Sequence, residues 1–503
     1  MLRERVRDSR LIKKIKSPVE ASLIIKDGMN IGTSGFTMSG YPKAVILALS
    51  ERLKATGDEM KIGLYTGASV GEELDGVLAK NDLIYRRYPY QTNNALRDRI
   101  NSGLCAYADI HLSHFAQYVK NGFVPRVDVA IVEAVAITAE GNIIPANSLG
   151  CTPTFVETAD QVIVEINLWQ PLELEGMADV YCVERPPFRK PIMIYKVNDR
   201  IGTHYIPCPW EKIAAIVITD IPDQGKKLAP IDEISQQISG FLIEFLKQEV
   251  KKGRLPQNLL PIQSGVGSVA NAVLAGLKDS GFENMSVYTE VIQDAVLDLI
   301  DCGKVKYAST TAVSPSSEGQ WKFFNNLQFY KDKIIIRPME ISNHPEVIRR
   351  LGVLAFNTAI EVDIYGNVNS TTIFGSRMMN GIGGSGDFTR NAFISVFTTP
   401  STAKNGTISS IVPMVSHHDH TEHDVMVIIT EQGLADLRGL SPKERAKSII
   451  ENCAHPSYRP ALWDYFKRAS QGKYLHTPHI LSEALSWHKN YLNENMGYEN
   501  SNQ

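Results

Sequence analysis

The chain has 503 residues, of which 43% are hydrophobic, and a formal net charge of −3. Two to four domains with large cores are therefore expected, while the lack of net positive charge does not favour a nucleic-acid partner and no apolar run is long enough for a membrane span. The six cysteines are scattered without CxxC spacing, which indicates buried thiols in a reducing compartment and predicts a cytoplasmic protein.

Apolar strand candidates alternate with helical segments in both halves of the chain. This alternation predicts an α/β fold with mostly parallel sheets. The candidate strands are Lys61–Tyr65, Val127–Ile137, Gln161–Ile166, Ile213–Ile218, Lys333–Ile336 and Val425–Ile429.

Helix ends are also visible in the sequence. A helix is predicted to follow Pro230, with Asp232 in its first turn, Lys252 in its last turn and Gly253 as its stop. Ser441-Pro442-Lys443-Glu444 is a capping box with Pro at the first helical position. From about this point to the end, the sequence predicts a helical C-terminal extension.

Three short motifs recur in the second half of the chain at offsets of about 225 residues. The pairs are Thr33-Ser34-Gly35-Phe36 with Gln263-Ser264-Gly265-Val266, Tyr65-Thr66-Gly67 with Tyr288-Thr289-Glu290, and Glu140-Gly141-Asn142 with Tyr365-Gly366-Asn367. A tandem duplication explains them, and the polar stretch Pro222–Pro230 is its natural boundary. The prediction is two α/β domains, residues 1–222 and 223–503, with Glu290 in the second copy where the first has Gly67.

Residues 263–290 contain the most informative pattern. A glycine-rich turn at 263–271 opens a helix, where backbone N–H groups can bind anionic oxygens, and the next strand delivers Glu290 to the same crevice. Gly265-x-Gly267-x-x-Ala270 followed by Glu290 fits the dinucleotide fingerprint of an NAD-dependent dehydrogenase. Alternatively, Glu290 is a nucleophile beside an oxyanion cradle, or a surface acid after a tight turn.

A second glycine cluster lies at Asn380–Phe388, with four glycines in six positions. It is either a flexible turn or a second set of amides for a carbonyl oxygen that becomes negative during acyl transfer. The run Ser416–Asp424 is rich in His and acids, but adjacent His residues on an extended segment point to opposite faces, which favours a polar loop over a metal site. Glu431 follows the strand Val425–Ile429 and is either a crevice residue or a solvated loop acid.

Several longer motifs together resemble the acetyl-CoA hydrolase/transferase family of class I CoA-transferases, and within it the succinyl-CoA:acetate branch. The resemblance runs from about residue 20 to about 490. The motifs that carry it are Gln263-Ser264-Gly265-Val266-Gly267, Tyr288-Thr289-Glu290-Val291-Ile292-Gln293-Asp294, Asp363-Ile364-Tyr365-Gly366-Asn367-Val368-Asn369-Ser370, Asn380–Phe388 and Thr430–Pro442.

The resemblance implies two NagB/RpiA-like α/β domains, a homodimer, coenzyme A as a substrate component and no metal. It implies that Glu290 is transiently acylated, that the amides of Val266 and Gly384 contact the oxyanion, and that Asn343 and Glu431 support the site. The residues that it implies for CoA contact are Gly265, Val266, Gly267, Ser268, Val269, Ile360, Asn380, Gly384 and Lys404. Two departures are His344, where relatives commonly have Asn, and His418, where many have Val.

The reaction implied is ping-pong transfer of CoA between an acyl-CoA (succinyl-CoA or acetyl-CoA) and a small carboxylate (acetate or succinate) through a glutamyl-CoA thioester. Two alternatives stay open: an acyl-CoA hydrolase that uses the same residues, and a non-catalytic CoA-binding protein. The resemblance favours CoA transfer over the NAD-dependent dehydrogenase, which becomes a distant alternative. No nucleic acid or membrane is expected as a partner.

Overall fold

The computed structural model describes residues 2–225, 230–265 and 267–496. The chain divides into two compact units. Unit 1 comprises Met1–Leu228 and Asn284–Leu351, and unit 2 comprises Ala229–Glu283 and Gly352–Gln503. The second half of the chain therefore contributes a long segment to unit 1. Because this division follows spatial contacts, the two sequence domains 1–222 and 223–503 stay a prediction.

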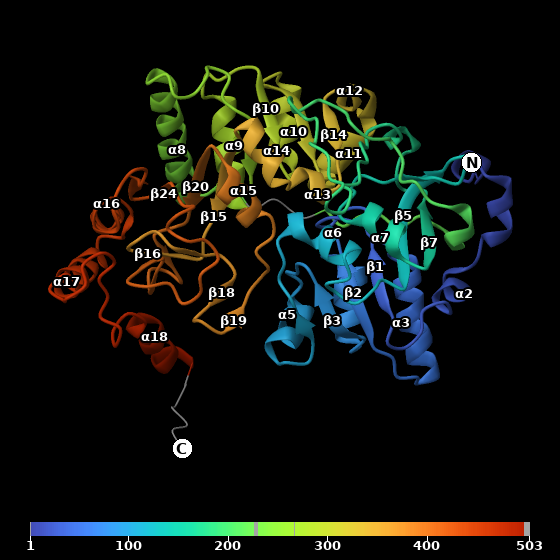
Figure 1. The fold of residues 1–503 in the computed structure, drawn as a ribbon, viewed down its shortest axis with the longest axis horizontal. Coiled ribbons are helices and arrows are strands. Elements are labelled where there is room, and N and C mark those ends of the chain that lie inside the picture. The colour runs from blue at the N-terminus through green and yellow to red at the C-terminus, as the bar shows by residue number, and fades with distance from the viewer. Residues whose placement is uncertain (1, 226–229, 266, 497–503) are drawn as a thin grey trace. The chain divides into compact units, whose positions relative to one another are not determined.

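Unit 1 contains a parallel sheet built by the first half of the chain (Figure 1). Its strand order is β4 (Ala106–Tyr107), β3 (Ile84–Tyr88), β2 (Ile62–Thr66), β1 (Asn30–Thr33), β5 (Val129–Ile137), β7 (Gln161–Asn167) and β8 (Ile213–Thr219). A short strand, β6 (Ile143–Pro145), pairs with β5 in the antiparallel direction. Every residue of β5 is buried, as expected of a strand covered on both faces.

Helices cover both faces of this sheet. Val45 and Leu49 of α3 (Ala44–Thr56) share one hydrophobic core with Ile31 of β1. The next residue of β1, Gly32, lies against Phe155 of α7 (Thr152–Thr158), since a Cβ on Gly32 would be 2.7 Å from the Phe155 ring. Successive residues of a strand face opposite sides, so α3 and α7 cover opposite faces.

The second half of the chain contributes one run of strands to each unit. Unit 1 contains β14 (Ile334–Ile336), β12 (Val305–Thr310) and β10 (Met285–Tyr288), in that order. Unit 2 contains β9 (Ile262–Ser264), β15 (Leu354–Thr358), β20 (Ile394–Thr398), β24 (Val427–Thr430) and β25 (Gly433–Asp436), in that order. Only β25 is antiparallel to its neighbour within these runs. The predicted α/β class is confirmed.

The strand orders of the two halves correspond. The run β4-β3-β2 matches β14-β12-β10, and the run β1-β5-β7-β8 matches β9-β15-β20-β24, when strands are compared by their place in each half. The predicted hairpin-type turns also match, because Gly141 has φ 96° and Gly366 has φ 92°, a region that favours glycine. These correspondences support the tandem duplication.

The predicted helix ends are confirmed. Helix α8 spans Glu233–Lys251, and its N-cap Asp232 accepts a hydrogen bond of 2.7 Å from the backbone N–H of Ser235. Helix α16 spans Pro442–Cys453 and begins with the predicted capping box. No helix in the described part of the chain has both the length and the apolar character that a membrane crossing needs.

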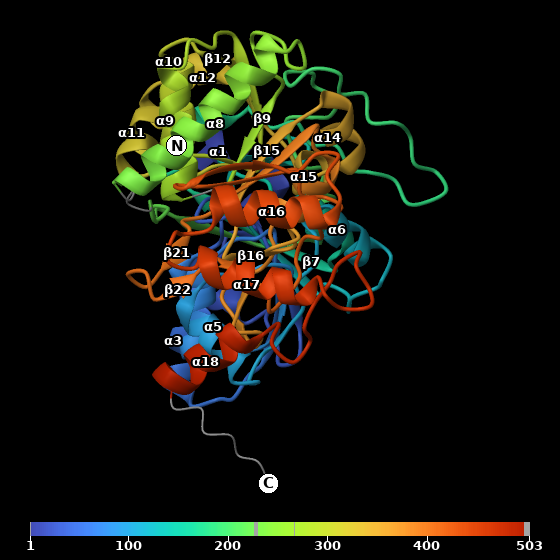
Figure 2. The same ribbon diagram turned by 90° about the vertical axis from the view of Figure 1, so that its left-hand side faces the viewer.

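The C-terminal extension consists of helices, as predicted. After α16 come α17 (Arg459–Ala469) and α18 (Ser486–Met496), which follow one another in Figure 2. Residues 470–485 between them form turns without a helix, and Gly472 and Pro478 explain this break because neither residue sustains a helix interior. The predicted helical C-terminal extension is therefore confirmed, with one non-helical connection between α17 and α18.

A buried acid in unit 1 gives the fold a defined response to pH. Glu340 lies in the short helix α13 (Met339–Ser342), and burial raises its pKa to about 6, although Lys120 at 3.8 Å acts in the opposite direction. As the pH rises from about 4.5 through 6, the unfolded chain releases this proton more readily than the folded chain does. The contribution of this group to stability is therefore present below pH 4.5 and lost as the pH rises through 6.

When the pH rises from 5 to 7.5, we expect the free energy of unfolding to fall less in Glu340→Gln than in the wild-type protein. The difference should reach about 1 kcal/mol in the free energy of unfolding, as measured by urea denaturation at both pH values. Glu318→Gln, a change at an exposed acid, is the control and should follow the wild-type pH dependence. Identical curves for Glu340→Gln and the wild-type protein would contradict this assignment.

Candidate active site

The backbone at Glu290 is held rigidly within unit 1. Glu290 follows β10 and precedes β11 (Val291–Ile292). Its carbonyl oxygen accepts hydrogen bonds from the backbone N–H groups of Thr311 (2.9 Å) and Ala312 (3.0 Å) and from the Thr310 hydroxyl (2.9 Å). Three donors on one carbonyl fix the position from which the side chain projects.

The Glu290 side chain has a buried amide partner. Asn343 immediately follows α13, is fully buried, and donates a hydrogen bond of 2.8 Å from Nδ2 to Glu290 Oε1. A donor at this distance orients the carboxylate. The structure thus brings together two of the residues predicted for the site, while their roles in the chemistry stay predictions.

His344, one of the two departures from the family pattern, is neutral at physiological pH. Burial lowers the pKa of His344 to about 4, and the charges of Arg189 and Arg350 act in the same direction. Its Nδ1 atom is buried and has no hydrogen-bond partner among the described residues. His344 therefore adds a neutral polar group next to Asn343 and no positive charge.

The surroundings of Glu290 include a tyrosine that the sequence analysis missed. Tyr90 follows β3, and burial together with the negative charges of Glu290 and Asp109 raises its pKa above the ordinary value. The phenol therefore stays protonated and is a hydrogen-bond donor. Its place at the carboxyl end of a strand was a signal that could have identified it, since sites in α/β sheets gather at that edge.

The first half of the chain anchors the segment around Glu290. Strand β11 pairs with β13 (Ala312–Val313), and the Val313 N–H donates to the Asn147 carbonyl at 3.0 Å. The Leu149 N–H donates to the Thr311 carbonyl, also at 3.0 Å. These backbone bonds explain why residues 284–351 belong to unit 1.

In unit 2, the predicted strand–turn–helix motif is confirmed. Strand β9 leads through the glycine-rich turn into α9 (Ser268–Lys278). Gly267 is the N-cap with φ 122°, a conformation that side chains disfavour, and the Gly265 N–H donates to the Phe356 carbonyl at 2.9 Å. The first N–H groups of such a helix are available for an anion. Ser268 and Val269 form the first turn, and Val266 lies outside the described residues.

The second glycine cluster leads into α15 (Ser385–Asn391), with Gly384 as its N-cap. Asn380 donates from Nδ2 to the carbonyls of Ser370 (3.0 Å) and Gly381 (2.9 Å), so its side chain shapes the loop. The buried ring of His420 lies 3.1 Å from the Ser385 hydroxyl through Nε2. The loop is therefore fixed at both ends, and the role of the Gly384 amide stays a prediction.

Glu431 lies between β24 and β25 in unit 2. Burial would raise its pKa, but hydrogen bonds from Ser401 and Gln432 outweigh burial and lower it. The Ser401 N–H donates to Oε2 at 2.8 Å, and Gln432 Nε2 donates to Oε1 at 2.9 Å. Glu431 is thus an ionised, well-anchored carboxylate, and its part in catalysis stays a prediction.

Ile360 and Lys404, two residues predicted to contact CoA, line one cavity of about 560 Å³ in unit 2. Ile360 precedes β16 (Glu361–Asp363). Lys404 lies in the turn between β21 (Thr402–Ala403) and β22 (Ile408–Ser409). A cavity of this size falls within the range of small-molecule and cofactor sites.

The His-rich run forms a loop whose side chains diverge. His417 Nε2 lies 3.5 Å from Asp419 Oδ1, while His420 packs its ring against Phe397 with centroids 4.8 Å apart. Within residues 2–225, 230–265 and 267–496, no three His, Cys, Asp or Glu side chains are arranged to hold a metal ion.

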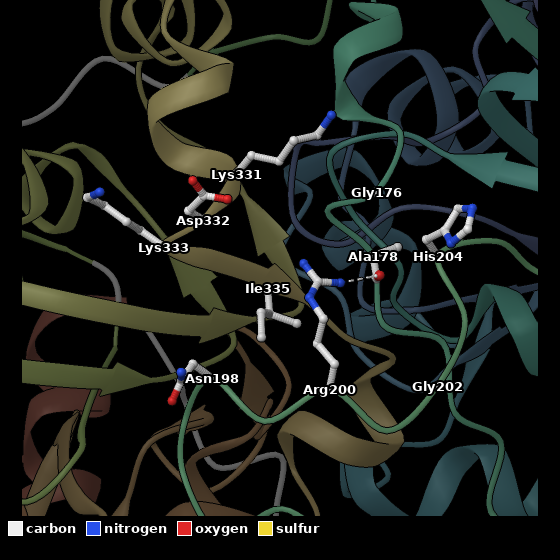
Figure 3. Close-up of a pocket in the computed structure, with 10 residues that line it drawn as sticks. All are labelled: Gly176, Ala178, Asn198, Arg200, Gly202, His204, Lys331, Asp332, Lys333 and Ile335. Atoms are coloured by element: carbon white, nitrogen blue, oxygen red, sulfur yellow. Dashed lines mark hydrogen bonds between the residues drawn. The ribbon is translucent and has the colours of Figure 1, made fainter.

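Unit 1 contains a different, polar cavity of about 510 Å³ (Figure 3). In it, the Arg200 guanidinium donates to the Ala178 carbonyl at 2.8 Å. Its lining residues are Gly176, Ala178, Asn198, Arg200, Gly202, His204, Lys331, Asp332, Lys333 and Ile335. None of the residues predicted for the active site is among them.

Solved structures share the fold of this chain. RipA from Yersinia pestis matches with a TM-score of 0.71 at 22% identity, covering 91% of this chain and 97% of that protein. A 4-hydroxybutyrate CoA-transferase from Porphyromonas gingivalis matches with a TM-score of 0.63 at 21% identity, covering 93% and 98%. At such identities the likeness concerns the fold.

Sequence comparisons identify the family. The acetyl-CoA hydrolase/transferase N-terminal domain matches residues 1–218, and the C-terminal domain of the same family matches residues 319–466. A succinyl-CoA:acetate CoA-transferase from Clostridium kluyveri is 58% identical, covering 97% of this chain and 91% of the relative. An acetyl-CoA hydrolase from Saccharomyces cerevisiae is 44% identical, covering 97% and 96%. The chain belongs to the acetyl-CoA hydrolase/transferase family.

Proposed function

We propose that this protein is a CoA-transferase that moves CoA between an acyl-CoA, either succinyl-CoA or acetyl-CoA, and a small carboxylate, either acetate or succinate. The observation that carries the proposal is the Glu290 carboxylate, whose backbone carbonyl accepts three hydrogen bonds and whose Oε1 accepts the Asn343 amide at 2.8 Å. The 58% identical relative bears the name of this activity. We further propose a cytoplasmic homodimer.

The proposed reaction begins with attack of a Glu290 carboxylate oxygen on the acyl carbonyl carbon of the thioester. The C–S bond breaks, leaving CoA as a thiolate and an acyl-glutamyl anhydride on the protein. The thiolate then attacks the Glu290 side-chain carbonyl, and the carboxylate of the former acyl group departs. An incoming carboxylate reverses both steps on the resulting glutamyl-CoA thioester, so the kinetics are ping-pong.

Position and electrostatics supply most of the rate in this scheme, because a carboxylate is a weak nucleophile. Holding the cleaved CoA beside the anhydride makes the second attack unimolecular, which contributes up to about 7–11 kcal/mol in favourable cases. Binding energy from the nucleotide and pantetheine portions can be used at the transition state. The amides of Val266 and Gly384 are the proposed oxyanion donors, and one such donor is worth about 2.7–4 kcal/mol.

Hydrolysis of acyl-CoA is the alternative function. It is supported by the relative named acetyl-CoA hydrolase, which is 44% identical to this chain. Water would replace the acceptor carboxylate at the same residues. The two activities differ in how well the site excludes water and binds the acceptor. Measuring loss of acyl-CoA with and without acetate or succinate separates them, because a transferase requires the acceptor for turnover.

A direct test is to incubate the protein with succinyl-CoA without an acceptor and to analyse the peptide spanning residues 279–303 by mass spectrometry. We expect a thioester adduct of CoA on Glu290, with loss of one water relative to the two free partners. Borohydride reduction of the thioester should mark the same residue. Turnover with no covalent intermediate on this peptide would contradict the proposed function.

A further inference from the structure

The polar cavity of unit 1 lies beside β14, the outer strand of the run β14-β12-β10 (Figure 3). Glu290 follows β10, and β12 lies between β10 and β14. None of the described residues predicted for catalysis or for CoA contact lines this cavity. A ligand bound in it would therefore lie apart from the reacting atoms of the proposed transfer.

Positively charged side chains dominate the lining of the cavity. Arg200, Lys331 and Lys333 line it together with a single carboxylate, that of Asp332, and His204 adds an imidazole. Among the described residues, no carboxylate forms an ion pair with any of these three cations. The whole chain has a net charge of −3, so this excess of positive charge is a local feature of the cavity.

The acids nearest to the lining are already paired with other arginines. Glu175 accepts hydrogen bonds of 2.9 and 2.6 Å from the two terminal nitrogens of Arg7. Asp179 forms a buried ion pair with Arg337. Because both carboxylates are neutralised in this way, the positive charge of the cavity is only weakly compensated from behind.

Arg200 is held in place through its own segment. The N–H groups of Ile201 and Gly202 donate to Asp179 Oδ1 at 3.0 and 2.7 Å, and the Arg200 guanidinium donates to the Ala178 carbonyl at 2.8 Å. Partial burial lowers the pKa of Arg200 by more than the charge of Asp179 raises it. An anion in the cavity would favour the charged guanidinium.

Lys331 approaches the cavity from the opposite wall. It is the last residue of α12 (Leu327–Lys331), and in Figure 3 its side chain extends toward the segment that contains Gly176. A Cβ on Gly176 would lie 3.6 Å from Lys331 Cε and 3.9 Å from Nζ. Because Gly176 has φ 98°, a conformation that disfavours side chains, this position leaves the ammonium group uncovered.

We propose that this cavity binds a small anion that carries at least two negatively charged groups, either phosphates or carboxylates. The Arg200 guanidinium offers a planar set of donors that suits both groups, and Lys331 offers a second cation from the other wall. Two charged groups on the ligand are required because the two cations belong to different walls. A volume of about 510 Å³ falls within the range of small-molecule sites. This inference does not depend on the proposed CoA transfer.

The test is calorimetric binding of pyrophosphate and of citrate to the full-length protein, with sodium chloride added to hold the ionic strength constant. We expect at least one of the two anions to bind saturably, at a single site in the cavity of each chain. The tighter of the two shows whether the site prefers phosphate or carboxylate groups. Thermal unfolding should shift to higher temperature with the same anion, since a ligand that binds only the folded state stabilises it.

Lys331→Met should weaken binding of that anion about tenfold, the scale of one hydrogen bond to a charged group. Arg200→Gln should weaken it at least as much. Because Arg200 also bonds the Ala178 carbonyl, Arg200→Lys is a second variant, which keeps the charge and should recover part of the affinity. Lys54→Met is the matched control, because Lys54 is an exposed lysine of α3 in unit 1.

Lys404→Met distinguishes this cavity from the predicted CoA site, because Lys404 lines the cavity of unit 2. Weaker binding in Lys331→Met and Arg200→Gln, with wild-type binding in Lys404→Met and Lys54→Met, would support the proposed anion site. If Lys404→Met loses the anion and Lys331→Met does not, the anion occupies the predicted CoA site and the inference is wrong. Absence of saturable binding of both anions to the wild-type protein would also overturn it.

Discussion

Glu290→Gln is expected to abolish CoA transfer while the protein stays folded and still binds CoA. Glutamine is nearly isosteric and keeps an oxygen acceptor for the Asn343 amide, which now bonds Glu290 Oε1 at 2.8 Å. The three hydrogen bonds to the Glu290 backbone carbonyl do not depend on the side chain. The substitution removes the carboxylate that is proposed to attack the thioester.

The expected loss is about 10⁴-fold or more in kcat, since removing a covalent nucleophile eliminates the pathway itself. Glu290→Asp should also lose several orders of magnitude because its carboxylate is one methylene too short. The measurements are exchange between succinyl-CoA and acetate, and CoA binding by calorimetry. Glu318→Gln, which changes an exposed acid that is not among the predicted site residues, is the control. Near-normal exchange in Glu290→Gln would remove this residue from the role of nucleophile.

Lys43→Met should strongly destabilise unit 1. Lys43 is fully buried, with Nζ 2.7 Å from Glu133 Oε2 and 2.8 Å from Asp223 Oδ1. Its Nζ also donates to the Tyr41 carbonyl at 2.9 Å. Methionine matches the length of the stem but leaves two buried carboxylates without their cation, and breaking a buried pair in this way costs about 3–5 kcal/mol.

The loss should grow with pH. Burial already raises the Glu133 pKa to about 7 against the lowering effect of Lys43, so removing Lys43 raises this pKa further. A folded-state pKa above the unfolded value gives stability that is lost as the pH rises through it. Urea denaturation at pH 5.5 and pH 8 should therefore show the larger deficit at pH 8. Adding Glu133→Gln should restore part of the stability, and a wild-type unfolding midpoint at pH 8 would contradict the prediction.

Local features of the fold could be predicted from the sequence because short-range chemistry determines them. Asp232 and Ser441 cap their helices as expected, since their side chains bond N–H groups within the first turn. The buried strands, such as β5, were visible as mainly apolar runs, although Glu133 interrupts the run in β5. Gly267 was expected at a helix start, and its φ of 122° explains why glycine stands there.

Features that depend on long-range placement could not be predicted. Asn343 and Glu290 are 53 residues apart, and their hydrogen bond exists because α13 and β10 meet in unit 1. Tyr90 approaches Glu290 from the other half of the chain, which no local pattern reveals. The family resemblance named Asn343 and Glu290 as site residues, but it did not reveal that residues 284–351 would pack with the first half.

That packing has a consequence for how such a gene can evolve. The backbone hydrogen bonds from Val313 to Asn147 and from Leu149 to Thr311 join the segment that contains Glu290 to the first half of the chain. If the gene were split near codon 223, the two halves would be made as separate polypeptides. These would have to associate before the backbone groups of Asn147, Leu149, Thr311 and Val313 could form their hydrogen bonds.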